Sequence, residues 1–77
     1  MNRLKELRNS KGLSMKQISK DLVKKKYFDN ITDATLSNYE NEKREPKSAT
    51  WELLADYFNV DPEYLVGWSD VRRKRDD

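Results

Sequence analysis

The sequence predicts an all-α protein, a compact bundle of five short helices. Apolar residues recur three or four positions apart, as on one face of a helix, and strand-like alternation is scarce. Capping residues, glycines and prolines also stand where such helices would begin and end. A chain of 77 residues holds one modest core. We therefore expect one domain at residues 1–70, followed by a charged tail or the start of a linker at residues 71–77.

The first two helices are predicted at residues 2–11 and from Ser14 onward. Gly12 follows the first helix, where a left-handed residue often ends a helix. Ser14 and Gln17 have the spacing of a capping box, in which each side chain binds the other residue's free amide. The apolar residues expected on the inner faces of these two helices are Leu4, Leu7, Ile18 and Leu22.

The third helix is predicted to begin after Thr32, which is a favourable N-cap residue. Asp33 in its first turn suits the positive end of the helix dipole. Leu36 and Tyr39 lie three residues apart and should face inward. The turn between the second and third helices then runs from Val23 to Thr32, which is long for a connection of this kind.

Two further helices are predicted in the last third of the chain. The fourth opens at Lys47 or Ser48, and its buried stripe consists of Trp51, Leu54, Ala55 and Phe58. The fifth begins at Asp61-Pro62, because proline is favoured at the first helical position, and ends at Gly67.

The composition argues against several functional classes. The chain has no Cys and no His, so it lacks disulfides, the commonest metal ligands and the usual neutral-pH base. We expect no catalytic residue, no metal site and no cofactor. No apolar run approaches the roughly 20 residues that span a bilayer, and no secretory signal opens the chain. The expected location is the cytoplasm of a bacterium or of a phage-infected host.

Charge is unevenly distributed along the chain. Residues 1–26 contain nine Lys or Arg and two Asp or Glu. Residues 48–70 contain no Lys or Arg and five Asp or Glu. This asymmetry indicates one basic and one acidic face, and the basic face favours a polyanionic partner.

Three stretches in this order resemble the lambda-repressor-like helix-turn-helix family of the Cro and Xre type: RLKELRNSKGLSMKQIS, TLSNYENEKREP and LLADYFNVDPEYLVG. The resemblance covers residues 2–67, and within the family it is strongest to the N-terminal domains of temperate-phage repressors. It implies sequence-specific binding of a double-stranded DNA operator, with the third helix in the major groove. The family usually joins the two helices by about three residues, so the turn at residues 23–32 is a departure.

The resemblance also implies which residues meet DNA. The base-contacting candidates are Asp33, Ala34, Ser37 and Asn38. The backbone-contacting candidates are Ser14, Lys16, Gln17, Thr35, Asn41, Lys43 and Arg44, to which we add Lys24, Lys25 and Lys26, although these three lysines have no counterpart in the family. Asn38 is the strongest candidate for base readout, because an amide can pair bidentately with adenine. Glu42 stands where the family often has Gly.

Several of these residues have a second interpretation. Asp33 could simply stabilise its helix end, and its charge would repel phosphates. The lysines at residues 24–26 could be a phosphate clamp or only the solvated end of a helix. Tyr27, Phe28 and Ile31 are expected to anchor the long turn on the domain.

The resemblance further implies a homodimer on DNA, formed through the 57–70 region or through a further C-terminal part. Tyr57, Tyr64 and Trp68 are the aromatic candidates for that contact, although Trp68 could instead cover the edge of the core. We therefore predict that the protein is a transcriptional regulator, specifically a phage-type repressor. The alternative is a protein-interaction or antitoxin-type module on the same fold.

Overall fold

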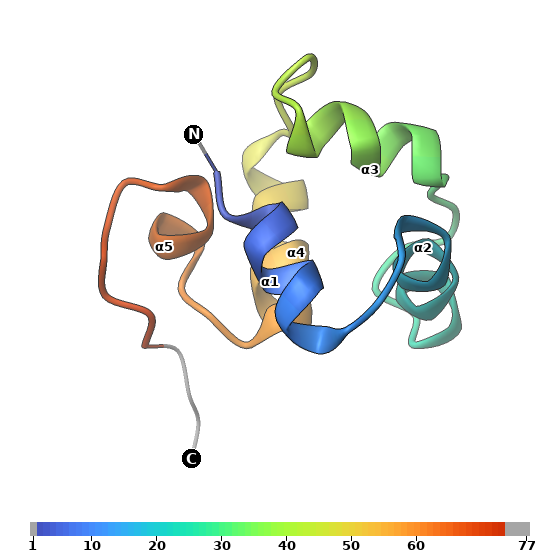
Figure 1. Cartoon of the computed structure of the whole chain (residues 1–77), viewed down its shortest axis with the longest axis horizontal. Helices are drawn as coiled ribbons and strands as arrows, with labels where there is room; N and C mark the ends of the chain where they lie inside the picture. Colours follow the sequence, from blue (N-terminus) through green and yellow to red (C-terminus); the bar gives the residue numbers. More distant parts are fainter. Residues whose placement is uncertain (1, 74–77) are drawn as a thin grey trace.

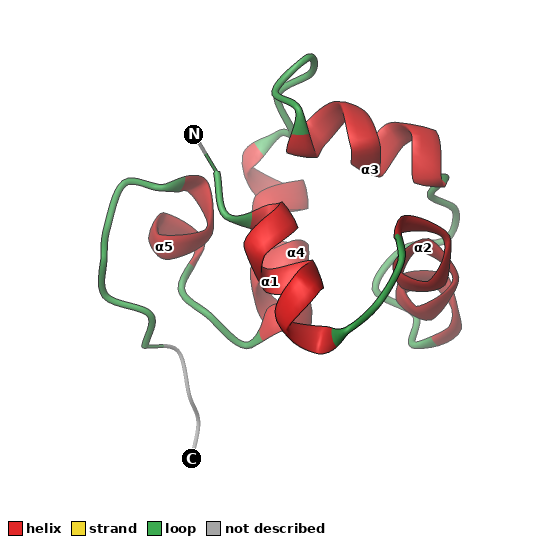
Figure 2. Cartoon of the chain, in the orientation of Figure 1, coloured by secondary structure: helices red, strands yellow, loops and turns green. Residues whose placement is uncertain are grey.

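All regular structure in residues 2–73, the part of the chain that the computed structural model describes, is helical (Figures 1 and 2). The helices are α1 (Leu4–Lys11), α2 (Met15–Lys24), α3 (Asp33–Glu40), α4 (Ser48–Phe58) and α5 (Pro62–Val66). This confirms the all-α class and the order of the five predicted helices. Residues 74–77 of the predicted tail lie outside the described residues.

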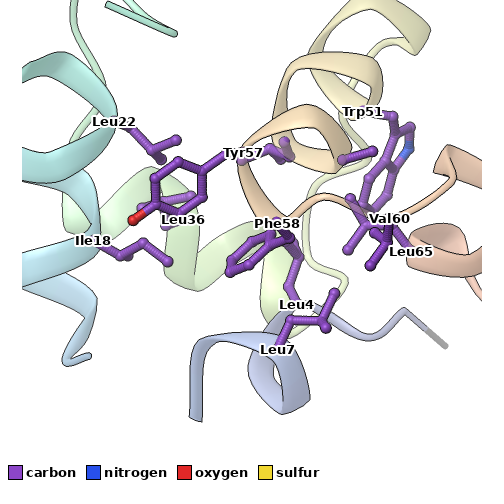
Figure 3. Packing of buried hydrophobic residues seen from close by; sticks show 12 residues of the cluster. Leu4, Leu7, Ile18, Leu22, Leu36, Trp51, Tyr57, Phe58, Val60 and Leu65 are labelled. Carbon is purple, nitrogen blue, oxygen red and sulfur yellow. The ribbon is translucent and has the colours of Figure 1, made fainter. Parts of the chain in front are cut away.

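The core lies between α4 and the other four helices. Each helix contributes at least one buried apolar side chain, and α4 contributes five (Figure 3). Leu22, Leu54 and Leu65, from α2, α4 and α5, are completely buried. The predicted inner stripes of α1, α2 and α4 are confirmed, because all their members are at most 7% exposed.

The residues predicted to cap α2 and α3 do so, whereas the predicted start of α1 is shifted. Ser14 and Gln17 form the capping box at the start of α2, and Thr32 accepts the Thr35 amide at the start of α3. The start of α1 was predicted two residues too early. The side-chain oxygen of Asn2 accepts the Leu4 amide at 3.1 Å, so Asn2 precedes the helix and binds its first free donor.

The turn between α2 and α3 was predicted to begin too early. Helix α2 continues through Lys24, so the connection is residues 25–32. Lys26 ends the helix in the left-handed conformation at φ 68°, while the Tyr27 amide donates back to the Leu22 carbonyl at 2.9 Å. Tyr27, Phe28 and Ile31 pack on the core as expected, so the long turn is held against the domain.

A single ion pair ties α1 to the end of α3. Arg8 donates to Glu40 from Nε at 2.7 Å and from Nη2 at 3.3 Å, and its Nη1 donates to the Leu13 carbonyl at 3.0 Å. Both charged side chains are largely buried, at 15% and 8% exposure. The hydrogen bond to Glu40 raises the pKa of the Arg8 guanidinium above its ordinary value.

A second polar contact ties α2 to α4. The Tyr57 hydroxyl donates to the Asp21 carboxylate, and in Figure 3 it points toward α2. The prediction that Tyr57 is a surface aromatic was wrong, because the ring is 6% exposed and packs edge-on against Tyr27 and Phe58. The hydrogen bond from Tyr57 holds the pKa of Asp21 below its ordinary value of 3.8, while burial raises the pKa of Tyr57.

The segment after α5 returns to the N-terminus. Arg3 donates to the Ser69 carbonyl at 3.0 Å and to Asp70 at 2.9 Å, and its guanidinium lies 4.2 Å from the centre of the Tyr64 ring. The Arg72 carbonyl accepts the Asp61 amide at 3.0 Å, so the first residues beyond the predicted domain end also contact α5. Trp68 does not cover the core, because it is 81% exposed.

We predict that Arg8→Met destabilises the protein by about 3 kcal/mol, since it leaves the Glu40 carboxylate buried without its partner. The double variant Arg8→Met/Glu40→Leu should recover most of that loss, because no buried charge is left alone. Urea unfolding of both variants measures the difference. A double variant as unstable as Arg8→Met would mean that the pair contributes through geometry that apolar side chains cannot replace.

We predict that Tyr57→Phe costs about 1–2 kcal/mol at neutral pH, where Asp21 is ionised. The folded-state pKa of Asp21 is lowered, so its contribution is complete above the unfolded pKa and is lost as pH falls through the lower folded value. The difference in unfolding free energy between Tyr57→Phe and the original protein should therefore shrink below about pH 4. Unfolding curves at several pH values measure it, and a pH-independent difference would contradict the assignment.

Candidate nucleic-acid interface

Helix α3 presents a polar face away from the core. Leu36 is its one buried residue, and it points into the cluster shown in Figure 3. Of the four predicted base-contacting residues, Asp33 and Ala34 are exposed, and Ser37 and Asn38 are half-buried. These four positions follow the i, i+1, i+4, i+5 pattern of one helical face, so they form one continuous surface.

The start of α2 lies beside that face. Met15 lines a shallow hollow of about 320 Å³ together with Asp33, Ala34 and Ser37. The neighbours of Met15 in the chain, Ser14 and Lys16, are exposed. The structure therefore brings the predicted backbone-contacting end of α2 next to the predicted base-contacting face of α3. The free amides of the first turn of α2 add partial positive charge at the same place.

Three of the predicted backbone contacts, Ser14, Gln17 and Thr35, already serve the helix caps. The Gln17 side-chain oxygen accepts the Ser14 amide at 2.8 Å. The Thr35 and Thr32 hydroxyls lie 3.0 Å apart and share a hydrogen bond. Gln17 still has its side-chain NH₂ donors available for another partner.

The C-terminal end of α3 is followed by Glu42, a residue in the left-handed backbone conformation. Asn41 follows the helix, and its side chain donates to the Ser37 hydroxyl at 3.3 Å. Glu42 has φ 61°, which glycine adopts more easily, in keeping with the usual Gly of the family at this position. Lys43 and Arg44 are exposed, and both their amides donate to the Asn38 carbonyl. The basic pair is thereby fixed beside the last turn of α3.

The three lysines at residues 24–26 lie in different surroundings. Lys24 lines a hollow with Val23 and Ile31 on one side of α2. The Lys25 ammonium lies 3.4 Å from the Asp21 carboxylate and 5.8 Å from the Tyr57 ring centre, facing α4. Lys26 is exposed in the left-handed conformation that ends α2.

Two residues of this surface were missed from the sequence. Met15 was not among the candidates, yet it lines the hollow beside α3. Lys20 is exposed on α2 and lines the same hollow as Lys24. The signal for Lys20 was available, since Lys16, Lys20 and Lys24 are spaced four residues apart.

No group of three or more His, Cys, Asp or Glu side chains in residues 2–73 is arranged to hold a metal ion. Within the same residues, no helix has the length and apolar character needed to cross a membrane.

Comparison with known proteins agrees with this geometry. The family model described as helix-turn-helix matches residues 4–65. The chain is 35% identical over 74 residues to the HTH-type transcriptional regulator ImmR of Bacillus subtilis (strain 168). That match covers 96% of this chain and 53% of the relative, so the chain spans about half of the relative's length. No solved structure matches the chain significantly. The family match extends from α1 to α5 and includes both helices of the candidate interface, and the chain belongs to the helix-turn-helix family.

Proposed function

We propose that this chain is the DNA-binding part of a transcriptional regulator, a phage-type repressor that reads an operator with α3 in the major groove. The observation that carries the proposal is the joint surface of α2 and α3, where Met15 lies against Asp33, Ala34 and Ser37. Family membership and the relative named as a transcriptional regulator support it. Since such an operator lies on bacterial or phage DNA, the proposed place of action is the cytoplasm.

The proposed division of labour follows from the position of each group. The residues that would face base edges lie on one side of α3, where two are exposed and two are half-buried: Asp33, Ala34, Ser37 and Asn38. Phosphates on either side would be met by the remaining polar and basic groups: Ser14, Lys16, Gln17, Thr35, Asn41, Lys43 and Arg44. Contacts to phosphates fix the register, whereas contacts to bases select the sequence.

We also propose that two copies bind a two-fold operator. Tyr57 is buried and cannot serve that contact, whereas Trp68 in the same 57–70 region is 81% exposed. Half-sites would then lie about one helical turn of DNA, or a multiple of it, apart.

A second candidate function is a protein-interaction module of the antitoxin type. The exposed Asp33 favours it, because a carboxylate on the reading face repels phosphates.

Selection of bound duplexes from a random pool should give a palindromic consensus, and binding to it should weaken steeply with salt. Fluorescence anisotropy between about 50 and 200 mM salt measures the slope. Absence of binding to any duplex at low salt would reject the DNA-binding function and favour the protein-interaction module. A consensus without two-fold symmetry would reject only the dimer.

We predict that Asn38→Ala weakens operator binding by about 1–3 kcal/mol and relaxes the preference at one base pair. Its affinity for a duplex of random sequence should change little, since non-specific binding depends on phosphates. Anisotropy titrations on the selected operator and on a random duplex measure both. Equal losses on the two duplexes would show that Asn38 does not read a base.

A further inference from the structure

Three lysines form a row along one side of α2. Lys16, Lys20 and Lys24 are exposed and stand four residues apart, so they project from the same face on three successive turns. From Lys16 to Lys24 the helix rises about 12 Å. A DNA strand carries one charge per about 3.4 Å of axis, so a row of this length can face several phosphates at once.

The row runs beside two hollows that lie along α2. Met15 lines the hollow at α3, and Ser19 and Val23 line a second one of about 330 Å³ at the turn. These three residues are also four apart, one position before each lysine, so the row flanks both hollows. Ile31, in the extended turn, forms the opposite wall of the second hollow. The row therefore leads from the proposed reading face of α3 to the extended turn.

We assign the neighbouring Lys25 to another surface, although the sequence placed it among the backbone-contacting candidates. Lys25 faces Asp21 and the ring of Tyr57, on the side of α2 that meets α4. Asp21 is also engaged there by the Tyr57 hydroxyl. Lys24 and Lys25 thus carry the same charge at adjacent positions and lie on different sides of the helix, which makes them a matched pair.

We propose that Lys16, Lys20 and Lys24 form a phosphate-binding surface that follows one DNA strand from the reading face toward the extended turn. The proposal rests on the DNA-binding function proposed above and assigns a further contact to it. The sugar–phosphate chain would lie along α2, with Lys20 and Lys24 meeting it beside the second hollow. This surface would also offset the repulsion between the exposed Asp33 and the phosphates.

The test is a salt titration of five variants: Lys16→Gln, Lys20→Gln, Lys20→Arg, Lys24→Gln and, as the control, Lys25→Gln. The probe is a fluorescein-labelled duplex of random sequence, on which only phosphate contacts count. Replacing any one lysine of the row by Gln should reduce the slope of log K against log salt by about 0.9. Lys20→Arg keeps the charge and should keep the original slope. Lys25→Gln removes the same charge and should leave the slope unchanged, since the Lys25 ammonium faces Asp21 and the Tyr57 ring on the other side of the helix.

Thermal unfolding of the same variants checks that they are folded, which is expected because the three side chains of the row are exposed. If the original chain binds the duplex but Lys20→Gln and Lys24→Gln keep its slope, the row is not a phosphate-binding surface and the proposed function stands. Equal slope changes for Lys24→Gln and Lys25→Gln would equally overturn the proposal, because the effect would then be one of net charge. If the original chain binds no DNA at low salt, both the proposed function and the row fail.

Discussion

The position of α3 depends on the ion pair between Arg8 and Glu40. The helix has only one fully buried residue, Leu36, so apolar packing alone gives it a weak hold on the domain. Arg8 contributes three hydrogen bonds, two to Glu40 at the end of α3 and one to the Leu13 carbonyl just before α2. One guanidinium therefore fixes α1, the start of α2 and the end of α3 relative to one another. The desolvation of the two charges is offset because their geometry is bidentate.

The contact between Tyr57 and Asp21 has the corresponding role for α2. Helix α4 supplies five of the twelve buried core residues. The hydroxyl of its Tyr57 donates to Asp21 of α2, and the Tyr57 ring packs against Tyr27 in the extended turn. Both helices of the helix-turn-helix are thus attached to the core by a charged hydrogen bond as well as by apolar contacts. Such bonds have a required direction, so they fix the angle of each helix more closely than apolar burial does. The exposed first turn of α3 is left free for a partner.

Local sequence patterns predicted most of the fold, but they could not predict contacts between residues that are far apart in the sequence. Caps at Ser14 and Thr32 and the apolar stripes were predictable, since each depends on residues within a few positions of one another. Tyr57 was misplaced because it lies off the stripe of α4 and is buried through a partner 36 positions earlier. Likewise, the four-residue spacing that separates Lys24 from Lys25 applies only if α2 continues through Lys24, whereas the sequence predicted a turn from Val23 onward. The end of α2 gave no recognisable signal, because the left-handed residue that follows the helix cap is Lys26 and not glycine.

The two tryptophans differ sharply in their surroundings. Trp51 is 7% exposed within the core, whereas Trp68 is 81% exposed after α5. The intrinsic fluorescence of the protein is therefore the sum of a shielded indole and a solvated one, and a water-soluble quencher acts almost entirely on the second. With Trp68 quenched, the remaining emission follows the integrity of the core. The quenched fraction in turn reports whether any molecule covers the surface beside α5, so the chain carries separate optical signals for its folding and for contacts at that surface.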